Sequence, residues 1–112
     1  MSVSLIAKQI GMDYDLVLED YCGDISLISS KLKTFVNDCD FPTLLTYKSE
    51  NYEEKIKEGA HKIKKLSEKL GIIPLQTLAK ETEEAKNSKI DVAFKALEQE
   101  FLRVEKILQD LA

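Results

Sequence analysis

The chain has a single histidine, His61, and its imidazole is the candidate reactive group. It lies in a stretch, residues 51–70, whose apolar side chains recur at helical spacing. At about 100° per residue, Ile63 lies roughly 200° around such a helix from His61, and Ile56 lies roughly 140° away in the other direction. If Ile56, Ile63 and Leu70 face a core, His61 faces water. The spacing therefore predicts an exposed imidazole.

Lysines surround His61 on this predicted helix. Lys64 and Lys65 follow it three and four residues later, so both ammonium groups can come near the ring, and Lys62 adds charge further round. Nearby cations disfavour the imidazolium and favour the neutral ring, which is the nucleophilic form. The same cations would neutralise a phosphoryl group on the ring, so the cluster suits covalent phosphate carriage. A surface histidine without a chemical role is the alternative that these residues leave open.

Other kinds of site lack the residues that they need. One histidine and two distant cysteines, Cys22 and Cys39, do not supply the roughly three protein ligands of a catalytic zinc ion. The same cysteines do not form a disulfide framework, so we expect free thiols and no metal. The chain has no GxxxxGKS, GxxxxGKT, GxGxxG or GxSxG motif, which argues against a nucleotide site or a hydrolase. The run Glu81-Thr82-Glu83-Glu84 is interpreted as a solvated helix face.

Length and composition favour one globular domain over residues 1–112. The chain is 44% hydrophobic and 32% charged, as is usual for a globular protein. A net charge of −4 predicts no general affinity for nucleic acid. No apolar run approaches the roughly 20 residues of a membrane span, and the N-terminal MSVSLIAKQIGMDYD lacks the basic-then-apolar pattern of a secretory signal. We therefore expect a cytoplasmic protein that binds neither nucleic acid nor membrane.

The N-terminal half of the chain is expected to contain three helices. A first short helix ends at Gly11, and a second short helix begins with Asp13 as its cap. Asp24 is the candidate cap of a longer helix, which Pro42 breaks or kinks near residues 38–41. Its predicted buried positions are Leu27 or Ile28, Leu32, Phe35 and Val36.

The C-terminal half is expected to contain three more helices. Asn51 followed by Glu54 is interpreted as a capping box that opens the helix of His61, and Gly71 ends that helix. Pro74 suits the first turn of the next helix, which carries Leu75, Leu78, Ala79, Thr82 and Ala85. Ser88, with an acidic residue three positions later, is the candidate cap of the last helix. The predicted apolar stripe of that helix is Ala93, Ala96, Leu97, Phe101, Val104, Ile107 and Leu108.

Four substantial helices with short connections pack most simply as an up-down-up-down bundle. We therefore expect an all-α fold, with a four-helix bundle over residues 24–111. The short helices within residues 1–23 would cover one open end of its core.

The residues around His61 resemble the signature of histidine-containing phosphotransfer (HPt) domains. In that family an Ala-His pair is followed by an aliphatic residue two after the histidine, lysine three after, and an aliphatic-glycine pair nine and ten after. This chain matches with Ala60-His61, Ile63, Lys64 and Leu70-Gly71. The usual entry to such domains is similar to Ile10-Gly11-Met12-Asp13, Tyr21-Cys22-Gly23-Asp24 and the spacing of Leu32, Phe35 and Asp38.

The resemblance covers nearly the whole chain and implies a four-helix bundle that carries phosphate on an exposed histidine. His61 would accept a phosphoryl group from an aspartate of a response-regulator receiver domain and pass it to another receiver, and Lys64 would stabilise that group. A hybrid histidine kinase is one source of such a receiver. The receiver supplies the metal and most catalytic groups, so the resemblance implies no cofactor and no enzyme activity of the chain's own. Members with a single histidine are usually monomers.

The residues after Lys64 depart from the family pattern. Lys65 stands where the family usually has glycine or serine, and Leu66 and Ser67 follow where small residues are usual. Lys65 could obstruct a receiver, fold aside or pair with phosphate. Glu68, on the face of His61, could draw a neighbouring lysine away by an ion pair. These departures keep one alternative open, an HPt-like bundle that binds a receiver or another signalling protein without carrying phosphate.

A docking face is expected on the His61 side of its helix, where Lys62, Lys65 and Glu68 are the candidate contact residues. The neighbouring helix that starts near Asp24 is expected to complete this face.

Overall fold

Helices make up nearly all of the fold, which is seen in a computed structural model that describes residues 2–111. They are α1 (Val3–Ile10), α2 (Tyr14–Asp20), α3 (Ile25–Cys39), α4 (Phe41–Ser49), α5 (Glu53–Lys69), α6 (Ile73–Glu84) and α7 (Lys89–Leu108). Within the described residues there is no strand, only one isolated antiparallel bridge between Met12 and Ile72. None of these helices is long and apolar enough to cross a membrane. The expected all-α fold is confirmed.

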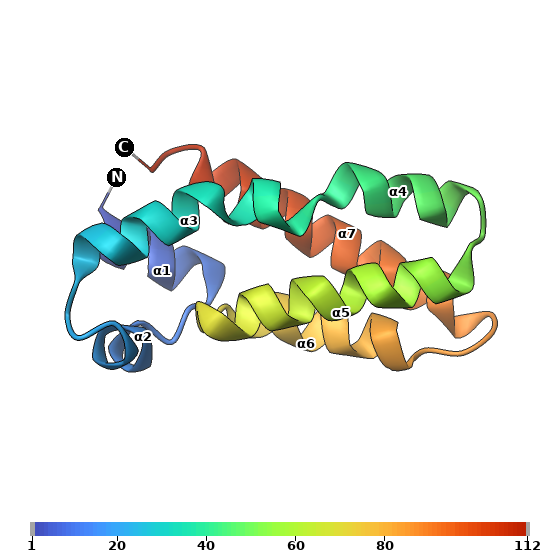
Figure 1. Cartoon of the computed structure of the whole chain (residues 1–112), viewed down its shortest axis with the longest axis horizontal. Coiled ribbons are helices and arrows are strands. Elements are labelled where there is room, and N and C mark those ends of the chain that lie inside the picture. Colours follow the sequence, from blue (N-terminus) through green and yellow to red (C-terminus); the bar gives the residue numbers. More distant parts are fainter. Residues whose placement is uncertain (1, 112) are drawn as a thin grey trace.

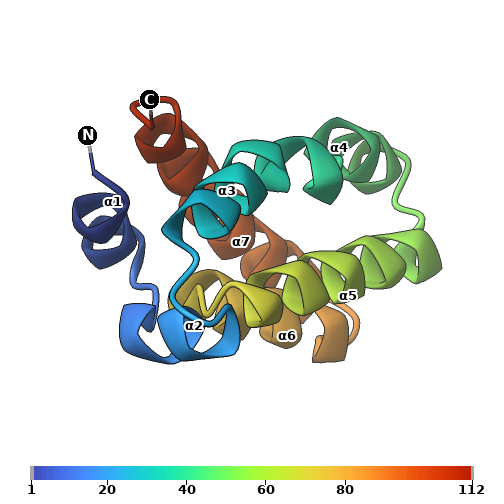
Figure 2. The same ribbon diagram turned by 60° about the vertical axis from the view of Figure 1, so that its left-hand side comes forward.

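The helices form an elongated body with principal extents of 42 × 22 × 18 Å. In Figure 1, α3 and α4 follow one another along one long side, α5 runs below them, and α6 and α7 lie behind. The most extensive helix contact joins α5 to α6, and the next joins α6 to α7. Figure 2 shows α1 beside the C-terminal end of α7, with α2 beneath α3 at the same end of the molecule. Helix α5 is therefore held from two sides, by α3 and α4 and by α6.

Helices α2 and α3 begin, and α1 ends, where the sequence predicts. The carboxylate of Asp13 accepts a hydrogen bond from the backbone N–H of Leu16, and that of Asp24 accepts one from Leu27. Gly11 adopts a left-handed conformation with φ of 73° and ends α1. These caps depend on residues within three positions of each other, so the sequence alone is sufficient to predict them.

The predicted capping box at Asn51 does not form. Asn51 is left-handed, with φ of 53°, and the N-cap position of α5 is Tyr52, which makes no side-chain capping bond. Asn51 instead ends α4, because its N–H donates to the Lys48 carbonyl and the N–H of Tyr52 donates to the Tyr47 carbonyl. This is the Schellman pattern, and the Tyr47 and Tyr52 rings meet edge to face at 6.0 Å. Because the connection is short, Asn51 would have to end α4 and cap α5 at once. It ends α4.

The predicted cap of α7 at Ser88 is also absent. Ser88 has helical dihedral angles and makes no side-chain capping bond. The backbone N–H groups of Lys89 and Ile90 donate instead to the carbonyls of Lys86 and Asn87. A backbone turn therefore satisfies the first amides of α7, so the hydroxyl of Ser88 is not needed there.

One continuous core receives buried side chains from every helix. At its centre the ring of Phe41 stacks on Phe101 at 4.4 Å between centroids and on Phe94 at 6.0 Å. The break at Asp40, left-handed with φ of 48°, lets α4 turn Phe41 inward after α3. Phe94 and Ile90 are buried although they were absent from the predicted stripe of α7.

The N-terminal segment holds the turn between α5 and α6. The N–H of Asp13 donates to the Gly71 carbonyl at 2.9 Å, and the N–H of Ile73 donates to the Gly11 carbonyl at 3.3 Å. Gly71 has φ of 61°, and a Cβ there would lie 2.8 Å from a methyl group of Val17. This turn sets which residues of α5 and α6 face each other, and the candidate site depends on that alignment.

Candidate functional site

Helix α5 presents His61 to solvent. Its buried face consists of Ile56, Ala60, Ile63 and Ser67. His61 lies away from this face, and its side chain is 48% exposed. The exposure predicted from the apolar spacing is confirmed.

The imidazole of His61 is in contact with α6. Its Nδ1 forms a short hydrogen bond with Oε2 of Glu83, and Nζ of Lys64 donates to the other oxygen, Oε1, at 2.7 Å. One carboxylate therefore joins the two α5 residues. The side chains of Lys64 and Glu83 are 20% and 25% exposed, so the cluster is partly withdrawn from water while the histidine remains accessible.

The hydrogen bonds determine which nitrogen of His61 is free. The hydrogen bond from Lys64 lowers the pKa of Glu83, and the bond to His61 adds to this effect against the opposing cost of burial. Glu83 is therefore ionised at neutral pH and can only accept hydrogen bonds, so Nδ1 carries the proton. In the neutral ring the lone pair is then on Nε2, for which no hydrogen-bond partner is found among residues 2–111. The neutral form of the ring would thus present this lone pair at the surface.

The interpretation of residues 81–84 as a solvated helix face is wrong for Glu83. A carboxylate in the last turn of a helix interacts unfavourably with the helix dipole, and the last turn of α6 contains no basic residue to offset this. The stability of α6 therefore does not explain why Glu83 is there, whereas its contacts with His61 and Lys64 do explain it. A signal was present in the sequence, because His61 and Glu83 each lie eleven residues from Ile72. Two antiparallel helices joined at that turn place such residues opposite each other.

The other lysines near His61 are not part of this cluster. Nζ of Lys65 lies 3.9 Å from Oε2 of Glu68, and its side chain is 56% exposed. Of the alternatives left open for Lys65, the structure shows the side chain turned toward Glu68. Lys62 lines a hollow of about 200 Å³ between the α3–α4 break and α5, on a different side of α5 from Glu83. The charged groups next to the imidazole are therefore the ammonium group of Lys64 and the carboxylate of Glu83, and not those of Lys62 or Lys65.

The helix in contact with His61 is α6, through Glu83, whereas the predicted docking face pairs α5 with α3 and stays a prediction. Helix α3 meets α5 at a separate hollow of about 120 Å³, whose lining includes Phe35, Asp38, Leu66 and Lys69.

The two cysteines are remote from this chemistry. Cys22 is an exposed free thiol and Cys39 a buried one. Burial raises the pKa of Cys39 to about 12, so this thiol stays protonated and unreactive at neutral pH. Among residues 2–111, no three His, Cys, Asp or Glu side chains are grouped so that they could hold a metal ion.

Comparisons of the chain with protein-family models, with curated proteins and with solved structures find no match. The chemistry of the His61, Lys64 and Glu83 cluster is therefore the basis on which a function is assigned.

Proposed function

We propose that this protein is a phosphorelay intermediate, which accepts a phosphoryl group on His61 from a receiver-domain aspartate and passes it to another receiver. The observation that supports this proposal most directly is the orientation of the imidazole. Glu83 accepts the hydrogen bond of Nδ1, and Nε2 is left exposed with its lone pair. The resemblance of the residues around His61 to HPt domains points to the same chemistry.

The transfer step needs a nucleophile and a group that stabilises the positive charge formed on that nucleophile. The lone pair of Nε2 attacks phosphorus, a P–N bond forms, and the P–O bond to the receiver's aspartate breaks, which returns the aspartate as a carboxylate. Because Nδ1 keeps its proton, the phosphorylated ring is an imidazolium. Glu83 lies against that nitrogen, so its negative charge stabilises the cation. Reversal of the same step returns the phosphoryl group to a second aspartate.

Lys64 is proposed to act on both the carboxylate and the phosphoryl group. An ammonium group has three N–H donors, and only one is used by Glu83. Another can donate to a phosphoryl oxygen on Nε2 without loss of the contact with Glu83. Lys64 would therefore keep Glu83 in place and neutralise part of the phosphoryl charge.

The fold proposed for this function is a four-helix bundle within a single domain over residues 1–112. The first member would be α3 and α4 together, broken at Asp40, and the others α5, α6 and α7. This arrangement is supported by the contacts of α5 with α3, α4 and α6, of α6 with α7, and of α7 with α3. The short helices α1 and α2 would cover one end. We propose that the protein works as a cytoplasmic monomer with receiver domains as its partners.

Phosphoryl transfer from a receiver domain tests this function. Receiver domains of the same organism are charged with acetyl phosphate and mixed with the protein, which is then run on a phosphate-affinity gel at neutral pH. We expect an acid-labile shifted band that is absent from His61→Gln. The melting temperature of this variant should stay close to that of the wild type, because His61 lies outside the core.

Two outcomes contradict the proposal in different ways. If no receiver produces a shifted band, the protein is a helical module that binds a receiver or another signalling protein without carrying phosphate. If the band persists in His61→Gln, the phosphate is carried on another residue.

A further inference from the structure

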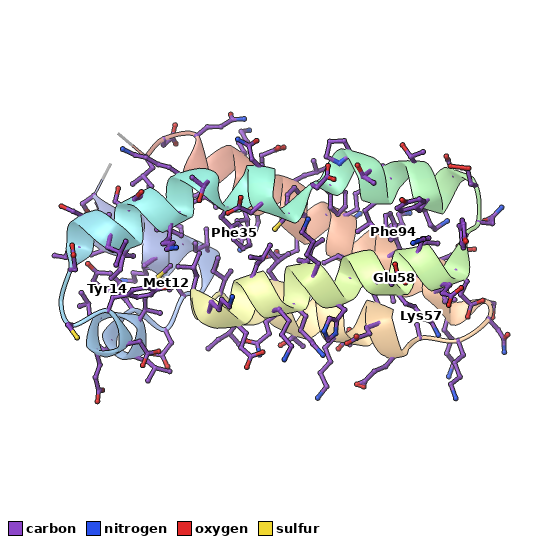
Figure 3. The ribbon with its side chains drawn as sticks, in the orientation of Figure 1. Met12, Tyr14, Phe35, Lys57, Glu58 and Phe94 are labelled. Atoms are coloured by element: carbon purple, nitrogen blue, oxygen red, sulfur yellow. The ribbon has the colours of Figure 1, made fainter. Side chains whose placement is uncertain are left out.

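Beside His61 lies a hollow of about 390 Å³ between α5 and α6. It is lined by Glu54, Lys57, Glu58, His61 and Glu83. Figure 3 marks Lys57 and Glu58 on the half of α5 that follows the α4–α5 connection. The hollow is open to solvent on the exposed face of α5, so a group of a bound partner can enter it.

Carboxylates dominate the charge of this hollow. Its one lysine, Lys57, already contacts Glu53 on its own helix at 3.4 Å. Glu54 has no ion pair with any other residue between 2 and 111, and Glu58 contacts only Lys55, at 3.2 Å on the exposed surface. The cationic side chain of a partner would therefore gain hydrogen bonds and charge pairing at Glu54 and Glu58.

The charge has the opposite sign on the other side of His61. Lys65 lies one turn further along α5, and its only ionic contact within residues 2–111 is the loose one with Glu68 at 3.9 Å. Exposed pairs of this kind contribute little, so Lys65 can turn toward a carboxylate on a partner at small cost. The exposed face of α5 is thus acidic before His61 and basic after it.

The helix dipole does not account for this division. Acidic residues in the first turn and basic residues in the last turn stabilise a helix, which explains Glu53 and Lys69 at the ends of α5. The effect falls off within those turns. Glu58 and Lys65 lie in the middle of the helix, three residues before and four residues after His61. Their positions on either side of His61 are therefore not an effect of the helix ends.

We infer that Glu58 and Lys65 set the orientation in which a receiver domain docks on His61, an inference that rests on the proposed function. The receiver would place a lysine or arginine over the hollow at Glu58 and a carboxylate over Lys65, on opposite sides of its reactive aspartate. The reverse orientation would bring like charges together at both points, which costs affinity and rate. The two residues therefore determine which receivers exchange phosphate with this protein.

Charge reversal with two phosphoryl donors tests this inference. Glu58→Lys, Lys65→Glu and the double variant are charged either by a receiver that transfers to the wild type or by phosphoramidate, a small donor that needs no docking. We expect each single reversal to slow transfer from the receiver about tenfold or more, which corresponds to about 1.4 kcal/mol of lost binding. Uptake from phosphoramidate should fall much less.

Lys95→Glu and Glu98→Lys are the matched controls, because these residues lie in the middle of α7, away from His61. The inference is overturned if Glu58→Lys and Lys65→Glu slow receiver transfer no more than these controls do. It is also overturned if both donors are slowed equally, since the residues would then act on the reactivity of His61. If no receiver charges the wild type, while phosphoramidate does, the proposed function itself fails and this inference with it.

Discussion

Two kinds of ion pair lie side by side on α5. The first kind joins residues three or four positions apart on the helix, as Lys65 and Glu68 do, with both side chains more than half exposed. The second kind joins α5 to α6, where the carboxylate of Glu83 pairs with both Lys64 and His61. The side chain of Glu83 is only 25% exposed. Pairs of the first kind can be read from the sequence and contribute a few tenths of a kcal/mol. The pair with Glu83 depends on how two helices align, and it orients a reactive group.

The sharpest test of this difference removes the charge at Glu83. We expect Glu83→Gln to slow phosphorylation of His61 by about tenfold to a hundredfold, the size of effect seen when a carboxylate that orients a metal-binding histidine is lost. The amide provides no negative charge for the phosphorylated ring and does not enforce the proton on Nδ1. The rate of receiver transfer would be measured beside Glu53→Gln, which removes the pair with Lys57 on the same helix and should stay near the wild-type rate. Equal effects in the two variants would show that the two kinds of pair do not differ.

The pH dependence of stability should show the contribution of the ionised Glu83. The hydrogen bond from Lys64 lowers the pKa of Glu83 in the folded state, whereas an unfolded glutamate titrates near about 4.3. A lowered folded pKa stabilises the fold above the unfolded pKa, and this contribution is lost as pH falls through the folded value. Wild type should therefore melt above Glu83→Gln at pH 7, and the difference should vanish in acid. A difference that is constant with pH would argue against an ionised Glu83.

Two buried hydroxyl groups also differ in whether they have a hydrogen-bond partner. The Oγ of Ser67 is buried and has no hydrogen-bond partner among the described residues 2–111, whereas the hydroxyl of buried Thr82 donates to the Leu78 carbonyl at 2.9 Å. We expect Ser67→Ala to stabilise the protein by about 1 kcal/mol, because alanine avoids the unpaired group and favours the helix. Thr82→Val should not gain stability. Urea unfolding of both variants measures this, and a loss of stability in Ser67→Ala would reveal a partner for that hydroxyl.

The smallest expected effect is at the pair within one helix. Glu68→Gln removes the contact with Lys65 and also a carboxylate that opposes the helix dipole in the last turn of α5. These changes offset each other, so the free energy of unfolding should change by less than about 0.5 kcal/mol. Urea unfolding would again be the measurement. A change above 1 kcal/mol would mean that surface pairs of α5 matter more to stability than their exposure indicates.

The features predicted correctly from the sequence depend on residues close together along the chain. The caps at Asp13 and Asp24, the end of α1 at Gly11 and the break before Pro42 each involve positions within a few residues. The exposure of His61 follows from the period of a single helix. These features need no knowledge of what the helix packs against.

The wrong predictions arose where two demands met at one residue. Asn51 has the side chain of an N-cap, yet it ends α4 because a left-handed residue was needed there. Ser88 could cap α7, but the backbone of the preceding turn already bonds the first amides. Local preference is not sufficient at such positions, since the neighbouring helix decides which demand prevails.

Local patterns along the chain are sufficient to predict most of the helices and the exposed histidine, whereas the packing of α5 on α6 sets which residue contacts that histidine. Glu83 reads as one of three similar acidic residues in its helix, and nothing within one helical turn separates it from Glu81 or Glu84. The turn at Gly71 and the bonds that hold it align α5 with α6, so that this one carboxylate meets Nδ1. The spacing of apolar residues indicates which face of a helix is exposed, but the packing of the helices determines which residue lies next to that face.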